Sequence, residues 1–269
     1  MRYEIIGRVR VGRDGNHHYV NAQKMEVLLR VLLVQADRIL TPDQLMLELW
    51  GEDLPRRARA GLHVYISQLR KLLASASASA SALRTASPGY VLTLRSDELD
   101  YHEWNRHLRD AAEAFRGRDF ARVSRCCDRA LALWRGLPEV GSSCGPIMEG
   151  LRSSLAVNYL DLVELSISSA IIQGRERDVV PELYRLVAAH PLREGFYMQL
   201  MLALYRIDRR ADALATYKRA WCVLDRELGV TPCKTMQELH RSILTSAQDA
   251  RMFGAYPLVG GFEKIEKLA

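Results

Sequence analysis

Basic side chains between positions 54 and 94 stand out, because this stretch contains no Asp or Glu. A helix over residues 57–73 would place its apolar side chains on one side and its basic and polar ones on the other. Such cationic groups bind phosphates and base edges, whereas an ordinary solvated helix face usually mixes both charge signs. The pattern therefore favours a helix that faces DNA. Its polar side carries Arg56, Arg59, His63, Ser67 and Arg70, with Lys71 just beyond.

The net charge is concentrated in the first third of the chain. Residues 1–96 hold 14 Lys and Arg against 8 Asp and Glu, which gives +6 (14 − 8). The remaining residues hold 24 of each sign, so they are neutral as a group. The asymmetry predicts an anion-binding module joined to a neutral one, with nucleic acid as the first candidate partner.

The segments before the basic helix can position it. Residues 3–11 predict a strand that ends at the hairpin signal Asp14-Gly15, with Tyr19 and Val20 in a returning strand. An apolar stripe predicts a helix over 22–36. A second helix should run from Pro42 to Gly51, because Thr41 and Gln44 have the spacing of a capping box.

The segments after the basic helix predict a hairpin. Residues 74–82 alternate Ala and Ser, as a flexible tether or a frayed end of the helix. Two β-prone runs, 83–86 and 90–94, then flank the turn signal Ser87-Pro88-Gly89. A hairpin directly after a basic helix predicts a winged helix-turn-helix.

From Asp97 onward amphipathic helices dominate to about Gln248. Arg177-Asp178 recurs 34 residues later as Ala211-Asp212, which is the tetratricopeptide period, and an irregular helical bundle is the alternative. The fold class is therefore mainly α (α+β), a winged helix-turn-helix followed by an all-α tetratricopeptide-like domain. The predicted helices cover 102–116, 119–134, 147–173, 176–189, 193–207 and 210–228.

Catalysis, metal binding and secretion find no support. The five cysteines include no CxxC pair, and the seven histidines lie outside any catalytic or zinc-binding pattern. Charged residues occur too early at the start of the chain for a signal peptide, and the sequence contains no run of 18 uncharged apolar residues. We expect a cytoplasmic, nucleoid-associated protein without membrane contact, metal, cofactor or enzymatic activity.

Several ordered motifs resemble one family, the Streptomyces antibiotic regulatory proteins. These activators combine an OmpR-type winged helix with a bacterial transcriptional activator domain. The resemblance covers the chain to about residue 245. It rests on Leu49-Trp50-Gly51, the segment Ile66 to Leu73, Pro88-Gly89-Tyr90, Asp100 with Trp104, Ala130 to Gly136, His190 to Glu194, and Arg219 to Pro232.

The resemblance implies an activator that binds direct repeats in double-stranded promoter DNA, as a homodimer or as paired monomers. It also implies recruitment of the RNA polymerase holoenzyme, including its sigma factor, at a secondary-metabolite (antibiotic) gene cluster. Thr85-Ala86-Ser87 supplies no basic wing residue beside Gly89-Tyr90, which puts minor-groove insertion in doubt. Larger members add a nucleotide-binding module, but this sequence contains no phosphate loop, so ATP control is not expected.

The predicted domains are a DNA-binding domain over 1–96, an activator domain over 97–250 and a tail over 251–269. The alternative is a helical-repeat adaptor whose basic domain binds an acidic protein, and nothing in the sequence indicates a small-molecule ligand for the helical half. The predicted base-reading residues are Arg57, Arg59, His63, Val64 and Ser67. The predicted phosphate contacts are Arg56, Arg70, Lys71, Thr41 and Arg84.

Overall fold

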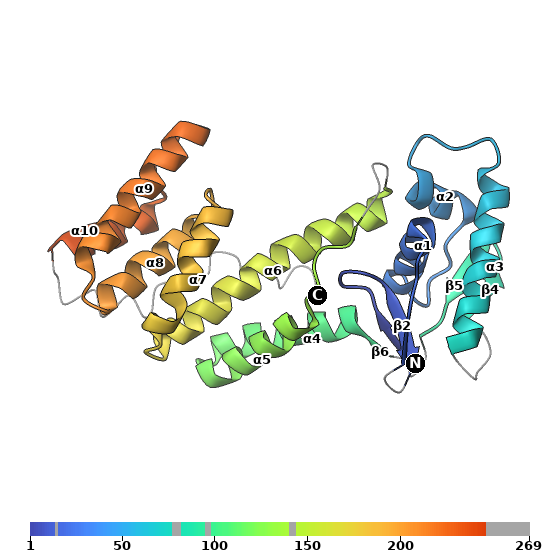
Figure 1. Cartoon of the computed structure of the whole chain (residues 1–269), viewed down its shortest axis with the longest axis horizontal. Coiled ribbons are helices and arrows are strands. Elements are labelled where there is room, and N and C mark those ends of the chain that lie inside the picture. Colours follow the sequence, from blue (N-terminus) through green and yellow to red (C-terminus); the bar gives the residue numbers. More distant parts are fainter. Residues whose placement is uncertain (14–15, 77–81, 95–97, 140–143, 246–269) are drawn as a thin grey trace. The chain divides into compact units, whose positions relative to one another are not determined.

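The computed structural model describes residues 1–13, 16–76, 82–94, 98–139 and 144–245 (Figure 1). It divides into two compact units. One contains residues 1–106 and 130–159, and the other contains residues 107–129 and the chain from 160 onward. The first unit thus takes in residues on both sides of the predicted boundary at 96. The predicted tail, 251–269, lies outside the described residues.

The first unit begins with a four-stranded sheet in the order β3-β2-β1-β6. β1 (Arg2–Glu4), β2 (Arg10–Arg13) and β3 (Asn16–Tyr19) are antiparallel neighbours, and β6 (Glu98–Leu99) pairs with β1 in parallel. The short β6 was not predicted, since two residues carry no periodicity. The predicted turn at Asp14-Gly15 lies outside the described residues, and its neighbours Arg13 and Asn16 pair across the hairpin.

The prediction of a single strand over residues 3–11 is wrong. The segment divides into β1 and β2 around Gly7, whose φ of 80° lies in the left-handed region that glycine adopts without strain. Ile5 and Ile6, just before this glycine, are fully buried and donate their backbone N–H groups to Asp100 instead of to a strand. A side chain far along the sequence therefore ends β1.

Three helices follow the sheet, α1 (Gln23–Val34), α2 (Pro42–Trp50) and α3 (Ala58–Ala76). The predicted capping box at the start of α2 is confirmed, because Thr41 Oγ1 accepts from Gln44 N at 3.2 Å and Gln44 Oε1 accepts from Thr41 N at 2.9 Å. α3 continues to Ala76, into the alternating Ala/Ser run, and residues 77–81 lie outside the described residues. These three helices build the helix-turn-helix.

The predicted hairpin consists of β4 (Leu83–Ala86) and β5 (Gly89–Leu92). β5 joins the turn between α1 and α2, where Leu40 N donates to Tyr90 O and Tyr90 N donates to Leu40 O, both at 2.9 Å. Asp37 N also donates to Leu92 O at 2.9 Å. This hairpin of β4 and β5, the wing, is therefore hydrogen-bonded directly to the helix-turn-helix.

Beyond β6 the described residues form helices. Six agree with the predicted ranges to within two residues, and α10, which was not given a range, is additional. These helices are α4 (Asp100–Arg116), α5 (Phe120–Leu133), α6 (Pro146–Ile172), α7 (Glu176–Ala189), α8 (Glu194–Arg206), α9 (Arg210–Leu228) and α10 (Lys234–Thr245).

The repeat in this half is visible in its turns. Arg118, Gly174 and Asp208 all have positive φ, and each lies two residues before a helix begins. The residue after each one donates its N–H to a carbonyl five residues back, over 2.9 Å, as in a Schellman motif. Because Gly174 and Asp208 are 34 residues apart, the structure repeats the period found in the sequence.

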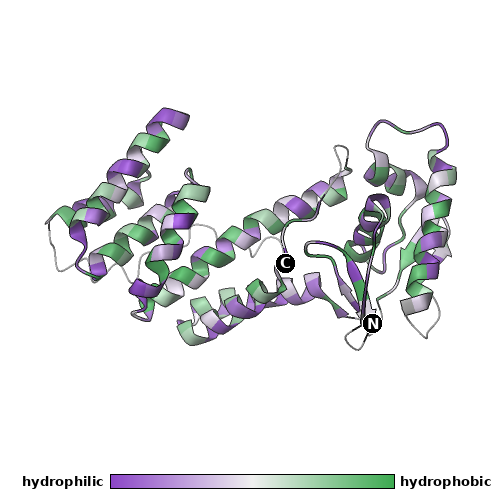
Figure 2. Ribbon diagram, viewed as in Figure 1, coloured by the Kyte–Doolittle hydropathy of each residue, from purple (hydrophilic) through white to green (hydrophobic). Residues whose placement is uncertain are grey.

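α6 satisfies the length and hydropathy required to cross a membrane, at a mean hydropathy of 1.5, but 67% of that window is buried within the protein. Core helices of globular domains have the same property. The hydrophobic colouring of α8 in Figure 2 has the same origin, because Phe196, Leu200 and Leu204 are fully or almost fully buried.

An aromatic cluster in the first unit consists of Trp104 of α4, Trp134 just after α5, and Tyr159 of α6. The ring centroids of Trp104 and Trp134 are 5.6 Å apart, and Tyr159 stacks on Trp134 at 4.3 Å. Trp104 is fully buried. The cluster joins the start of the helical half to the same compact unit as the winged helix.

Candidate nucleic-acid interface

The structure fixes α3 by its apolar side. Ala58, Leu62, Ile66, Leu69 and Leu73 are buried at a spacing of three or four residues, as the helical wheel predicted. Gly61 lies against the Trp50 ring of α2, where an added Cβ would be 3.4 Å from the indole. These contacts hold α3 against α2 with its other side facing outward.

The outward side of α3 brings together the predicted base-reading residues. Arg59, His63, Val64 and Ser67 are all exposed, and Val64 retains 53% of its surface although it is apolar. Arg57 is exposed just before the helix, and its carbonyl accepts from Gly61 N at 2.9 Å. The face is thus cationic with one apolar contact point, a combination suited to guanine edges and a thymine methyl group.

Sequence reasoning missed Gln68. It is exposed on α3 one turn beyond Val64, and a glutamine amide can pair with adenine. Its side chain is uncharged, so the basic pattern of the helix did not indicate it. Its position on the helical wheel, about 40° from Val64 and on the same exposed side, was the signal that could have identified it.

Of the predicted phosphate contacts, Arg56, Lys71 and Arg84 are exposed. Thr41 is half-buried at the start of α2, where its hydroxyl oxygen accepts a capping bond and its O–H remains a donor. Arg70 differs from the others. Its guanidinium donates to Leu83 O and to Thr85 Oγ1, both on the wing.

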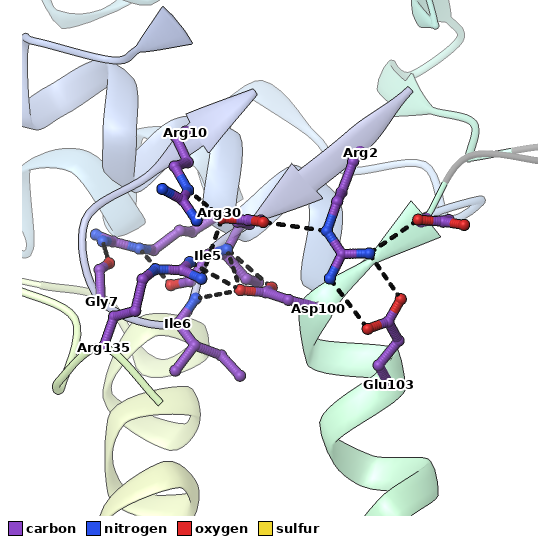
Figure 3. Close-up of polar contacts among 11 residues, drawn as sticks. Arg2, Ile5, Ile6, Gly7, Arg10, Arg30, Asp100, Glu103 and Arg135 are labelled. Atoms are coloured by element: carbon purple, nitrogen blue, oxygen red, sulfur yellow. Dashed lines mark hydrogen bonds and ion pairs between the residues drawn. The ribbon is translucent and has the colours of Figure 1, made fainter. Parts of the chain in front are cut away.

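A polar cluster fastens the amino-terminal sheet to the start of the helical half (Figure 3). Asp100, fully buried at the start of α4, accepts from Ile5 N at 2.8 Å, from Ile6 N at 3.1 Å and from Arg135 Nη2 at 3.0 Å. Burial raises the pKa of Asp100 above its ordinary value, although these donors oppose that rise. The carboxylate satisfies backbone groups that β1 leaves unpaired.

Glu4, on β1, is the second carboxylate of this cluster. It binds Arg10, Arg2 (3.1 Å) and Arg135 (3.1 Å). Burial would raise the pKa of Glu4, but the hydrogen bonds from Arg10 and Arg2 and the charge of Arg135 outweigh it and lower the pKa. Arg2 continues to Glu103 on α4 at 3.1 Å, so the cluster spans the sheet and the helix.

A second fastening joins α2 to α6. The Glu48 carboxylate, with 2% of the residue exposed, accepts from Ile147 N at 2.8 Å and from Met148 N at 3.0 Å. These N–H groups belong to the first turn of α6, which has no intrahelical acceptor for them. Glu48 of the helix-turn-helix therefore supplies the amino-terminal cap of α6.

The described residues contain no group of three or more His, Cys, Asp or Glu side chains placed to hold a metal ion. Cys126 and Cys127 are buried, and burial raises the pKa of Cys127 to about 12, so its thiol stays protonated at neutral pH. The exposed side of α3 carries Arg59 and Lys71, whose charges suit an anionic surface. A helix-turn-helix whose last helix, here α3, is basic and exposed, and against which a hairpin packs, defines the winged helix-turn-helix class.

Comparison with family models gives two adjoining matches. Residues 20–92 match the model described as "Transcriptional regulatory protein, C terminal". Residues 99–244 match the bacterial transcriptional activator domain. The second match covers more than half of the chain.

Two relatives from Streptomyces are named as regulators. The chain is 37% identical to the regulatory protein AfsR of Streptomyces coelicolor over 91% of its own length and 24% of AfsR. It is 31% identical to the transcriptional regulator RedD of the same organism, over 93% of this chain and 71% of RedD. The chain thus spans about a quarter of AfsR but most of RedD.

A solved structure has the same fold. Mycobacterium tuberculosis EmbR, in complex with a low affinity phosphopeptide, superposes with a TM-score of 0.83 and 28% sequence identity, over 98% of this chain and 70% of that one. The chain belongs to the Streptomyces antibiotic regulatory protein family of transcription regulators.

Proposed function

We propose that this regulator activates promoters of a secondary-metabolite (antibiotic) gene cluster by binding direct repeats in double-stranded DNA. The observation that carries the proposal is the exposed side of α3, where cationic and apolar side chains share one face of a helix that contains no Asp or Glu. A face of this composition complements the major groove in charge and in shape. The relatives AfsR and RedD, which are named as regulators, support the same role.

In this proposal the first half of α3 reads bases. Arg57 or Arg59 pairs with a guanine edge through two hydrogen bonds, and Val64 contacts a thymine methyl group. His63 and Ser67 lie on the same exposed face and complete the base-reading set. Their separation by three or four residues lets them follow successive base pairs along the groove.

Phosphate contacts set affinity and register. Arg56, Lys71 and Arg84 reach the backbone from three segments, and Thr41 donates its hydroxyl from the start of α2. Arg70 reaches a phosphate with the N–H groups that are not bonded to the wing. These contacts carry little sequence information by themselves.

Direct repeats place two copies of the protein in the same orientation, either as a homodimer or as paired monomers. The tetratricopeptide-like helices form the domain that meets the second copy and the RNA polymerase holoenzyme with its sigma factor. Repeats of this kind present extended surfaces for proteins. A protein engaged in this way is located on the nucleoid.

Salt dependence tests the proposal. Affinity of the full chain for a duplex enriched from a random pool should fall linearly with salt on logarithmic axes, with a slope of about −0.9 for each phosphate contacted. The four cationic contacts predict a slope near −4, by the same relation, and the uncharged Thr41 adds nothing to it. An affinity for an acidic polypeptide that exceeds the affinity for every duplex would favour an adaptor and contradict the proposal.

A further inference from the structure

Arg70 connects α3 to both strands of the wing. Its Nε donates to Leu83 O at 3.2 Å, and its Nη2 donates to Thr85 Oγ1 at 2.8 Å. Its guanidinium carbon also lies 5.9 Å from the centroid of the Tyr90 ring. Leu83 and Thr85 belong to β4 and Tyr90 belongs to β5. The Arg70 side chain therefore contacts both strands of the hairpin.

On the side away from α3, the wing is held by backbone hydrogen bonds. Backbone bonds between Leu40 and Tyr90, and from Asp37 to Leu92, attach β5 to the turn between α1 and α2. Gly89 allows this approach, because a Cβ there would overlap the carbonyl of Leu40. β5 is thus fixed by main-chain groups, whereas the link from α3 to β4 includes a side chain that mutation can change.

From these contacts we propose that Arg70 is a positioning residue that sets the wing relative to α3, so that both reach the same duplex. The inference rests on the proposed DNA binding. Arg84 stands between Leu83 and Thr85 in β4 and is exposed, and its guanidinium donates to Thr93 Oγ1 at 3.4 Å. When Arg70 holds β4, the Arg84 guanidinium is placed for a phosphate while α3 occupies the groove.

The geometry separates this role from a phosphate contact. A guanidinium forms two hydrogen bonds from a planar fork and stacks on an aromatic ring, whereas a lysine ammonium is a point charge on a flexible stem. Arg70→Lys therefore keeps the charge but loses the fork. A phosphate contact would largely survive this change, and the attachment of the wing would not.

The test is a double-mutant cycle with the full chain and a duplex that the wild type enriches from a random pool. Arg70→Lys should lower affinity about tenfold in the wild-type background, as loss of charged hydrogen bonds predicts. In the Arg84→Ala background the same change should lower affinity less than about threefold, because the wing contact is already lost. Lys71→Ala, at an exposed position on α3, is the control and should combine additively with Arg84→Ala.

A second readout needs no DNA. Hydrogen exchange of the amides in β4 should be faster in Arg70→Lys and unchanged in Lys71→Ala. Thr85→Val removes one acceptor and keeps the side-chain shape, so it should give a smaller increase and remains informative if Arg70→Lys folds poorly.

Additive effects of Arg70→Lys and Arg84→Ala, or wild-type exchange of β4 in Arg70→Lys, would overturn the positioning role. If the wild type bound no duplex while the exchange difference persisted, the proposed function would fail. Arg70 would then have a purely structural role.

Discussion

Glu48 of α2 caps Met148 of α6, a residue one hundred positions later, with its carboxylate 3.0 Å from the Met148 backbone N. The bond crosses from the helix-turn-helix to α6 within one compact unit. The same carboxylate accepts from Ile147 N, so two amide groups depend on one side chain. This contact holds α2 to the first turn of α6 through the backbone of α6.

Glu48→Ala should lower the free energy of unfolding by about 2–3 kcal/mol, because it leaves two N–H groups without their acceptor. Glu48→Gln keeps one carbonyl oxygen and should have about half that effect. Urea denaturation of the full chain measures both. Glu52→Ala, at an exposed position just after α2, is the control. Equal stability of Glu48→Ala and Glu52→Ala would show that the cap contributes nothing.

Arg59→Ala should weaken binding to the enriched duplex by about 1–3 kcal/mol and should relax the preference for it over scrambled duplexes. The cause is the loss of a bidentate pair with a base, which random DNA does not offer. Competition binding measures the ratio of the two affinities. Lys71→Ala should instead weaken both duplexes about equally. An equal loss on both duplexes in Arg59→Ala would remove this side chain from base reading.

Glu4 predicts a defined response to acid. Its pKa in the folded protein lies below the ordinary value of 4.5, chiefly because the hydrogen bonds from Arg10 and Arg2 overcome burial. Its contribution to stability is therefore complete above a pH of about 4.5 and is lost as the pH falls through the lowered pKa. Asp100, whose pKa is raised, acts in the opposite direction, so the comparison must be between variants.

Glu4→Gln should lower the Tm at neutral pH and should lose less further stability than the wild type between pH 5 and pH 3, roughly the window that this linkage defines. Circular dichroism melts at several pH values measure this difference. Glu113→Gln, at an exposed carboxylate paired with Arg122 at 3.5 Å, is the control. The explanation is wrong if Glu4→Gln loses stability in acid as steeply as the wild type.

Gly89→Ala should destabilise the fold by about 3 kcal/mol, because its Cβ would overlap the Leu40 carbonyl and neither backbone can withdraw without breaking the bridge. Gly150→Ala is the matched control. That glycine is exposed inside α6 with open space around it, so alanine should stabilise the helix by about 0.5–1 kcal/mol. Thermal melts compare the two, and similar Tm values would contradict the crowding at Gly89.

Local periodicity and capping chemistry were sufficient to predict most of the elements. Thr41 and Gln44 marked the start of α2, and the repeated apolar stripes located α3 and the helices to Leu228. α10 lies in the region where the sequence predicts helices, to about Gln248, but it received no range of its own, because Gly229 and Pro232 are strong stop signals for the helix before it.

The exposed side of α3 also followed from the helical wheel, because an apolar back determines which residues face outward. Contacts between distant segments did not follow. Asp100 divides the opening strand, and Arg70 turns to the wing, through partners that lie 95 and 15 positions away. A single sequence gives no measure of such distances, so the bonds from Arg70 to the wing were not predicted beside its proposed phosphate contact.

The pairing of Trp104 with Trp134, and of Trp134 with Tyr159, gives the protein an optical signal of its own. Indole rings at this separation couple electronically, so their near-ultraviolet circular dichroism depends on their mutual orientation. Loosening of the packing between α4 and α6 at this cluster would change that spectrum. Such loosening can therefore be followed without an attached label while the regulator meets its partners.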